Sequence, residues 1–147
     1  MAPKTVENFL HLVKGFQRAD KEDIGYSGSE VHRIVKGMFV QCGRIQVKDH
    51  ADGVSFHKGQ FEDESFEVKH TEIGLLGMCK RNGQKHTNES QFYITTGAPL
   101  TFLDGQNVVF GRVISGMRAI RLIEKMETLN ERPNDVVRIC SAGEFTK

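Results

Sequence analysis

Three side chains with different chemistry lie close together in the segment VHRIVKGMFVQCGR, residues 31–44: Arg33, Phe39 and Gln41. The Val and Ile residues around them predict two short strands joined by a turn at the Lys-Gly pair. Alternate residues of a strand share one face, so these odd-numbered side chains emerge together if the turn keeps the register. A guanidinium, an aromatic ring and an amide would then share one patch of sheet. A solvent-facing strand, with the arginine stem lying along it, explains the same pattern without any function.

No other motif in the sequence localises a reaction. GxSxG, a P-loop, GxGxxG, CxxC and HExxH are all absent, and the carboxylates of FEDESFE at 61–67 are typical of a solvated face or a cap. Composition does not exclude a Ser-His-Asp site, but nothing places one. The six His and the three Cys (Cys42, Cys79 and Cys140) lack ligand spacing, so we predict no metal, no cofactor and no disulfide framework. One arginine, one amide and apolar walls suit only chemistry that needs neither a nucleophile nor a proton shuttle.

Length and charge indicate one ordinary globular domain over residues 1–147. Hydrophobic content of 38% and charged content of 27% are average for a soluble protein. The net charge of +1 argues against nucleic acid or an anionic membrane as partner. We see no apolar run of membrane-spanning length and no secretory signal in MAPKTVENFLHLVKG, and therefore predict reduced thiols and a cytoplasmic location.

The hydrophobic periodicity predicts two helices and several short strands. The first helix spans about residues 3–14, with a proline in its first turn, and the second follows the Ser-Gly pair at 115–116. Loops are expected at 48–60 and 79–90. Many short strands with only two helices favour a sheet that closes on itself. The expected strands are 31–35, 38–42, 73–78, 91–96, 107–114 and 135–141.

Nearly the whole chain resembles the cyclophilins, a family of peptidyl-prolyl cis-trans isomerases. The resemblance is carried by APKTVENFLHL, GYSGSEVHRIVKGMFVQCG, FEDESFEVKHTEIGLLGM, TNESQFYIT, FLDGQNVVFGRVISGM and VRICSAGE, in the family's order. It implies a mainly β fold: a cyclophilin-like closed antiparallel barrel, eight-stranded in the family, with two capping α-helices and the active site on its outer surface. Because the chain begins at the first helix, we expect the family's first two strands to be missing.

The resemblance also implies a set of site residues. Arg33 matches the catalytic arginine, and Gln41 matches the glutamine that binds the substrate beside it. Met38 and Phe39 stand in the reverse of the family's order. Tyr93 replaces a phenylalanine of the family's proline pocket, and Asn107 occupies a position that is often histidine. The expected substrate-binding residues are Met38, Phe39, Cys79, Tyr93, Phe102, Leu103 and Asn107.

One loop departs from the family pattern. The segment CKRNGQKHTNES, at 79–90, is about two residues longer than usual. Within it Glu89 replaces a glycine, and a glutamate would be strained there if the position requires a positive φ.

The implied reaction is rotation about X–Pro peptide bonds, whose barrier is about 18–20 kcal/mol. The twisted prolyl nitrogen is a better acceptor than the planar one, so an always-charged donor such as Arg33 stabilises the transition state selectively. A rate acceleration of ~10⁵ requires the activation free energy to fall by roughly 7 kcal/mol. One preorganised donor supplies about 3–4 kcal/mol, and orientation of the peptide must supply the remainder.

The expected partners are proline-containing peptides or proteins. Cyclosporin-like ligands should bind with reduced affinity, because Phe102 stands where many members carry a tryptophan. The alternative function is a catalytically weak or inactive module that binds a proline-containing segment, which the substitutions around the pocket favour.

Overall fold

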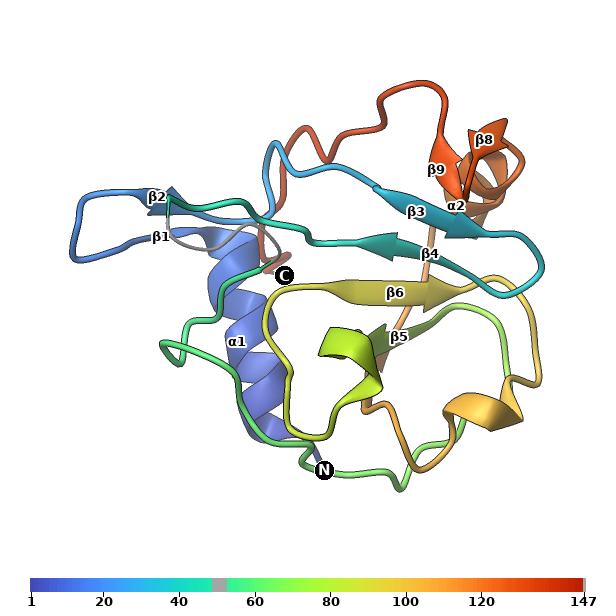
Figure 1. Cartoon of the computed structure of the whole chain (residues 1–147), viewed down its shortest axis with the longest axis horizontal. Helices are drawn as coiled ribbons and strands as arrows, with labels where there is room; N and C mark the ends of the chain where they lie inside the picture. The colour runs from blue at the N-terminus through green and yellow to red at the C-terminus, as the bar shows by residue number, and fades with distance from the viewer. Residues whose placement is uncertain (49–52, 147) are drawn as a thin grey trace.

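The computed structural model describes residues 1–48 and 53–146 (Figure 1). It contains two α-helices, a five-stranded antiparallel sheet and two small hairpins. No helix in the described ranges is both long and apolar enough to cross a bilayer.

The central sheet has the strand order β3-β4-β6-β5-β7. In the described part of the chain its outer strands do not pair with each other, so the expected closed barrel is wrong for this structure. Five strands are fewer than the eight or so that close around a core of side chains. The strands are β3 (Arg33–Val35), β4 (Phe39–Cys42), β5 (Leu75–Met78), β6 (Phe92–Thr95) and β7 (Val109–Arg112).

Each central strand lies inside one of the predicted ranges, but the strand predicted at 135–141 is wrong. There the backbone makes only an isolated bridge, between Arg138 and Glu30. Its hydrogen bonds to residues 28–31 do not form a regular ladder, which is why no strand results.

Several short elements were not predicted from the sequence. They are the hairpin of β1 (Phe16–Gln17) and β2 (Asp23–Ile24), the hairpin of β8 (Thr128–Leu129) and β9 (Arg132–Pro133), and the 3₁₀ turns η1 (Arg81–Gly83) and η2 (Thr101–Leu103).

Helix α1 (Pro3–Lys14) confirms the predicted helix at 3–14: it starts with proline in its first turn and ends at Gly15, whose φ is 79°. Its buried face includes Leu12 but also two polar residues, Thr5 and Asn8, which are hydrogen-bonded across to other segments. Helix α2 (Met117–Glu124) is shorter and has no buried residue. Figure 1 shows the two helices at opposite ends of the sheet, where α1 contacts β7 and α2 contacts β3 and β4.

The strand alternation separates the core from a second apolar cluster. Val40 and Cys42 of β4 belong to the main core, together with Leu12 and Met78. Phe39, on the opposite face of β4, belongs to a smaller cluster near the surface. The sheet therefore presents the predicted site residues Phe39 and Gln41 on the face that the main core does not occupy.

Candidate active site

Arg33 and Gln41 are direct cross-strand partners in the β3–β4 hairpin. Arg33 Nη1 donates to Gln41 Oε1 at 3.4 Å, and the guanidinium carbon lies 5.7 Å from the centre of the Phe39 ring. The turn keeps the register, so the expected common face is confirmed. A cation, an amide and an aromatic ring are thus brought together as the spacing predicted.

The other edge of the guanidinium contacts a carboxylate that sequence reasoning did not identify. Glu131 Oε1 accepts from Arg33 Nε at 3.2 Å and from Arg33 Nη2 at 3.0 Å. Glu131 lies in the turn between β8 and β9, 98 residues further along the chain. No sequence signal pointed to it, because this proximity depends on tertiary folding.

A compact apolar cluster lies beside Arg33. Its buried residues are Phe39, Tyr93 and Leu100, with the Phe39 and Tyr93 ring centres 5.2 Å apart. The partly buried residues packed against these three are Val35, Met38, Cys79 and Leu103. Five predicted substrate-binding residues therefore gather here: Met38, Phe39, Cys79, Tyr93 and Leu103. Val35 and Leu100 were missed, because an apolar residue gives no local sign of which cluster it joins.

Two polar residues, His70 and Asp104, hold Tyr93 in this cluster. The Tyr93 hydroxyl lies 2.6 Å from His70 Nε2, and His70 Nδ1 lies 2.9 Å from Asp104 Oδ1. Hydrogen bonds from the His70 backbone and ring lower the pKa of Asp104, whereas burial raises the pKa of the Tyr93 hydroxyl well above its ordinary value. The Tyr93 ring fits because residue 77 is glycine: a Cβ there would meet the ring at 2.2 Å.

Two predicted residues lie outside this cluster. Phe102 is 52% exposed, on the 3₁₀ turn η2. Asn107 uses its side-chain amide to donate to the Met78 backbone oxygen at 3.0 Å. The substrate-binding roles predicted for both residues remain predictions.

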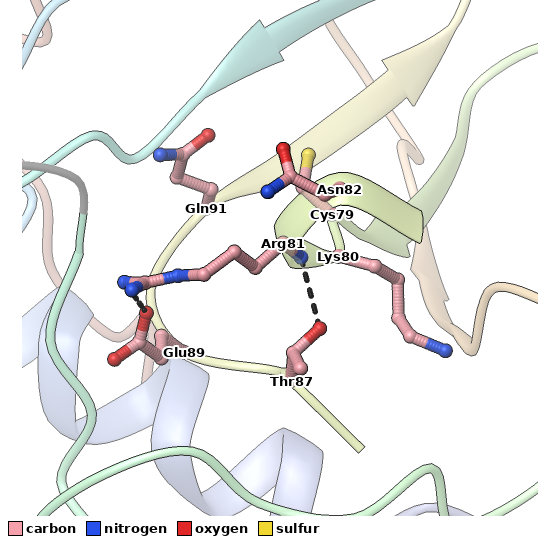
Figure 2. Close-up of a pocket in the computed structure, with 7 residues that line it drawn as sticks. All are labelled: Cys79, Lys80, Arg81, Asn82, Thr87, Glu89 and Gln91. Atoms are coloured by element: carbon pink, nitrogen blue, oxygen red, sulfur yellow. Dashed lines mark hydrogen bonds and ion pairs between the residues drawn. The ribbon is translucent and has the colours of Figure 1, made fainter. Parts of the chain in front are cut away.

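A second hollow of about 170 Å³ adjoins the first site (Figure 2). Its link to the first site is Gln91, whose Oε1 accepts from Gln41 Nε2 at 2.8 Å. Arg81 reaches across the hollow to Glu89 at 3.2 Å, and the Arg81 backbone N–H donates to Thr87 Oγ1 at 2.9 Å (Figure 2). The lining residues are Cys79, Lys80, Arg81, Asn82, Thr87, Glu89 and Gln91.

The longer loop at 79–90 adopts its path without the strain expected at Glu89. The positive φ angles fall instead on Asn82, at 51°, on Gly83, at 69°, and on His86, at 58°. Glycine adopts this conformation readily, and asparagine and histidine are among the side-chain-bearing residues that adopt it most often. The Glu89 carboxylate lies 3.2 Å from the Arg81 guanidinium.

A buried ion pair fixes the base of this loop. Lys80 Nζ lies 2.6 Å from Asp63 Oδ2, and these side chains are only 4% and 1% exposed. Asn88 Nδ2 also donates to Asp63, at 2.8 Å. Burial alone would raise the pKa of Asp63, but the hydrogen bonds from Lys80 and Asn88 outweigh it and the pKa is lowered.

Together these groups can hold an extended peptide but cannot attack it. The Cys79 thiol is kept neutral because burial raises its pKa far above the ordinary value, and the Tyr93 hydroxyl is likewise neutral. What remains beside them are the Arg33 cation, the amide side chains of Gln41 and Gln91, and the apolar cluster. This arrangement suits binding and electrostatic stabilisation of a peptide backbone.

Comparison with known proteins identifies related sequences. A family model described as cyclophilin type peptidyl-prolyl cis-trans isomerase/CLD matches residues 1–144. The chain is 42% identical over 147 residues to NK-tumor recognition protein of Mus musculus and, equally, of Homo sapiens. The match covers 97% of this chain but 10% of each relative, so the chain spans about a tenth of the length of these curated relatives.

Proposed function

The chain belongs to the cyclophilin-type peptidyl-prolyl cis-trans isomerase family, and from that premise we propose that it accelerates rotation about X–Pro bonds through Arg33. The observation that carries the proposal is the position of the guanidinium, 5.7 Å from the Phe39 ring and beside Gln41. A cation beside an apolar cluster can meet an acceptor that arrives with the substrate.

The proline ring would pack against the apolar cluster of Phe39, Tyr93 and Leu100, beside the partly buried Met38 and Leu103. As the amide twists, conjugation is lost and the prolyl nitrogen regains its lone pair. An N–H of Arg33 donates to that nitrogen more strongly in the twisted state than in the planar one, which lowers the barrier. No covalent bond to the protein forms and no proton is transferred.

Gln41 would hold the peptide backbone before the proline. Its amide is oriented by Gln91 at 2.8 Å and faces Arg33 at 3.4 Å. The residues preceding proline would then lie over the second hollow, where Arg81 and Glu89 face each other. Because that hollow carries both charges, we expect it to select among peptides.

Two further expectations belong to this proposal. Cyclosporin-like ligands bind with reduced affinity, because the exposed Phe102 ring has no N–H to donate. The protein works in a reducing compartment such as the cytoplasm, since all three cysteines, each of them described, are free thiols.

An isomerisation assay on Arg33→Ala tests the proposal. We expect kcat/KM for a proline-containing peptide to fall at least about tenfold, because the donor to the prolyl nitrogen is lost. Arg33→Lys should recover only part of the rate, since a point charge lacks the planar fork of arginine. NMR exchange spectroscopy on the peptide measures both.

Arg138→Ala is the matched control, because Arg138 is also a half-exposed arginine in an ion pair, with Glu30 at 3.1 Å. Its kcat/KM should stay at the wild-type value. An unchanged rate in Arg33→Ala would refute the catalytic role. Peptide binding by the wild type without any acceleration would support a binding module instead.

A further inference from the structure

We propose that Glu131 is a positioning residue that holds the Arg33 guanidinium in its working orientation. The inference rests on the proposed isomerase function and adds to it a group from a distant turn. The Glu131 carboxylate binds Arg33 and would act on the substrate through it.

The contact geometry divides the guanidinium into two edges. Nε and Nη2 both donate to Glu131 Oε1, at 3.2 and 3.0 Å. Nη1 points the other way, toward Gln41 at 3.4 Å. The carboxylate therefore occupies the edge away from Gln41 and leaves for a bound peptide the N–H of Nη1 that does not donate to Gln41.

The backbone at Glu131 is one that glutamate rarely adopts. Asn130 and Glu131 form a two-residue loop between β8 and β9, with φ angles of 51° and 66°. Hairpin loops with two positive φ angles favour Asn-Gly, so the second position suits glycine. Strained non-glycine residues concentrate where the side chain has a function. At position 131 glutamate stands where glycine would be favoured, and its carboxylate is the group that binds Arg33.

The turn is held in place independently of that side chain. The Ile34 backbone N–H donates to the Glu131 backbone oxygen at 2.7 Å, next to Arg33 in β3. A change of side chain at 131 thus leaves the anchor of the hairpin intact and removes only the carboxylate.

Stability alone does not account for the ion pair. Both side chains are 45% exposed, and an ion pair in water contributes little to folding. The ion pair instead restricts the conformation of Arg33, because a long half-exposed side chain otherwise samples many rotamers. A donor that is already oriented does not have to be ordered during the reaction.

The test compares Glu131→Gln with Glu30→Gln. Glu30 is the matched control, because it pairs with Arg138 at nearly the same distance, 3.1 Å, away from Arg33. For Glu131→Gln we expect kcat to fall about tenfold and KM to change less than about twofold, since the pocket is untouched. Glu30→Gln should retain the wild-type kcat.

Glu131→Gly separates positioning from folding. Glycine suits the φ of 66°, so the melting temperature should stay equal to or rise above that of the wild type, while kcat falls as in Glu131→Gln. A merely structural role would move both quantities in the same direction. An unchanged or increased kcat in both variants would overturn the proposal.

A measurement that needs no turnover tests the positioning role separately from the proposed isomerase activity. The ¹⁵N NMR signal of Arg33 Nε, assigned with Arg33→Lys, should show restricted side-chain motion in the wild type and faster motion in Glu131→Gln. Equal motion in the two proteins would overturn the positioning role even if the wild type is an active isomerase. Restricted motion in a wild type that does not isomerise would support positioning and refute the isomerase.

Discussion

At the scale of single residues, Tyr93 contributes its ring to the apolar cluster and its hydroxyl to a polar contact with His70. The ring is 2% exposed and packs against Phe39, while its hydroxyl meets the fully buried His70. A phenylalanine would fill the same space but leave one nitrogen of His70 without this partner. We therefore expect the hydroxyl to stabilise the apolar cluster and not to act in the proposed reaction.

Tyr93→Phe should lower the free energy of unfolding by about 1–2 kcal/mol, because a buried acceptor or donor on His70 is left unsatisfied. The value of kcat/KM should change less than about threefold, since the ring stays in place. Urea denaturation and the isomerisation assay measure the two effects.

Tyr26→Phe is the control variant for that prediction. Tyr26 is equally buried, at 2% exposure, and its hydroxyl donates to the Ser90 backbone oxygen at 2.8 Å. We expect a similar loss of stability and no change at the pocket. If Tyr93→Phe were as stable as the wild type, the bond to His70 would not form in solution.

At the scale of elements, the loop at 79–90 depends on a carboxylate outside it. Asp63 accepts from Lys80 and Asn88 within the buried base of the loop. The rest of the loop, from Arg81 to His86, is exposed. Asp63 is therefore a buried charged anchor of the loop that lines the second hollow.

Asp63→Asn should destabilise the protein by about 3 kcal/mol at neutral pH, because it leaves the Lys80 ammonium buried without its partner. The folded-state pKa of Asp63 is lowered, so the wild-type interaction stabilises the fold above the unfolded-state pKa, near 4. That stabilisation is lost as the pH falls through the folded-state pKa. The difference between the two proteins should thus shrink below about pH 4, as chemical denaturation at several pH values can measure.

Glu62→Gln provides the control for that titration. Glu62 also pairs with a lysine, Lys4 at 3.0 Å, but both side chains are exposed. Its replacement should change stability little at any pH. A constant difference between wild type and Asp63→Asn from pH 7 to 3 would contradict the assigned role of Asp63.

At the scale of the whole molecule, burial is uneven along the chain. Leu12, Val40, Met78 and Val108 are completely buried. By contrast, no residue from 110 to 146, all of them described, is buried. This last quarter includes α2 and the hairpin that carries Glu131, so part of the site rests on the least buried region of the fold.

Native-state hydrogen exchange should follow this division. Amides of β4, β5 and β6 should be the most protected, and those of α2 and the β8–β9 hairpin should exchange through smaller openings, because few apolar contacts hold them. Mass spectrometry of proteolytic fragments can measure this. Equal protection of α2 and β6 would contradict the prediction and indicate a single cooperative unit.

By itself the sequence determined the two helices, the positions of the central strands and one face of the site. Apolar periodicity with a terminal proline and glycine predicted α1 over about residues 3–14, and strand alternation predicted Arg33 on the same face as Gln41, since both depend on neighbours in the chain. Resemblance to the family supplied most of the pocket residues. Only the tertiary structure decided the open sheet, the irregular path of 135–141, and the contacts of Glu131, Gln91 and His70 with the site. These depend on segments that meet across tens of residues, and no local propensity encodes such meetings.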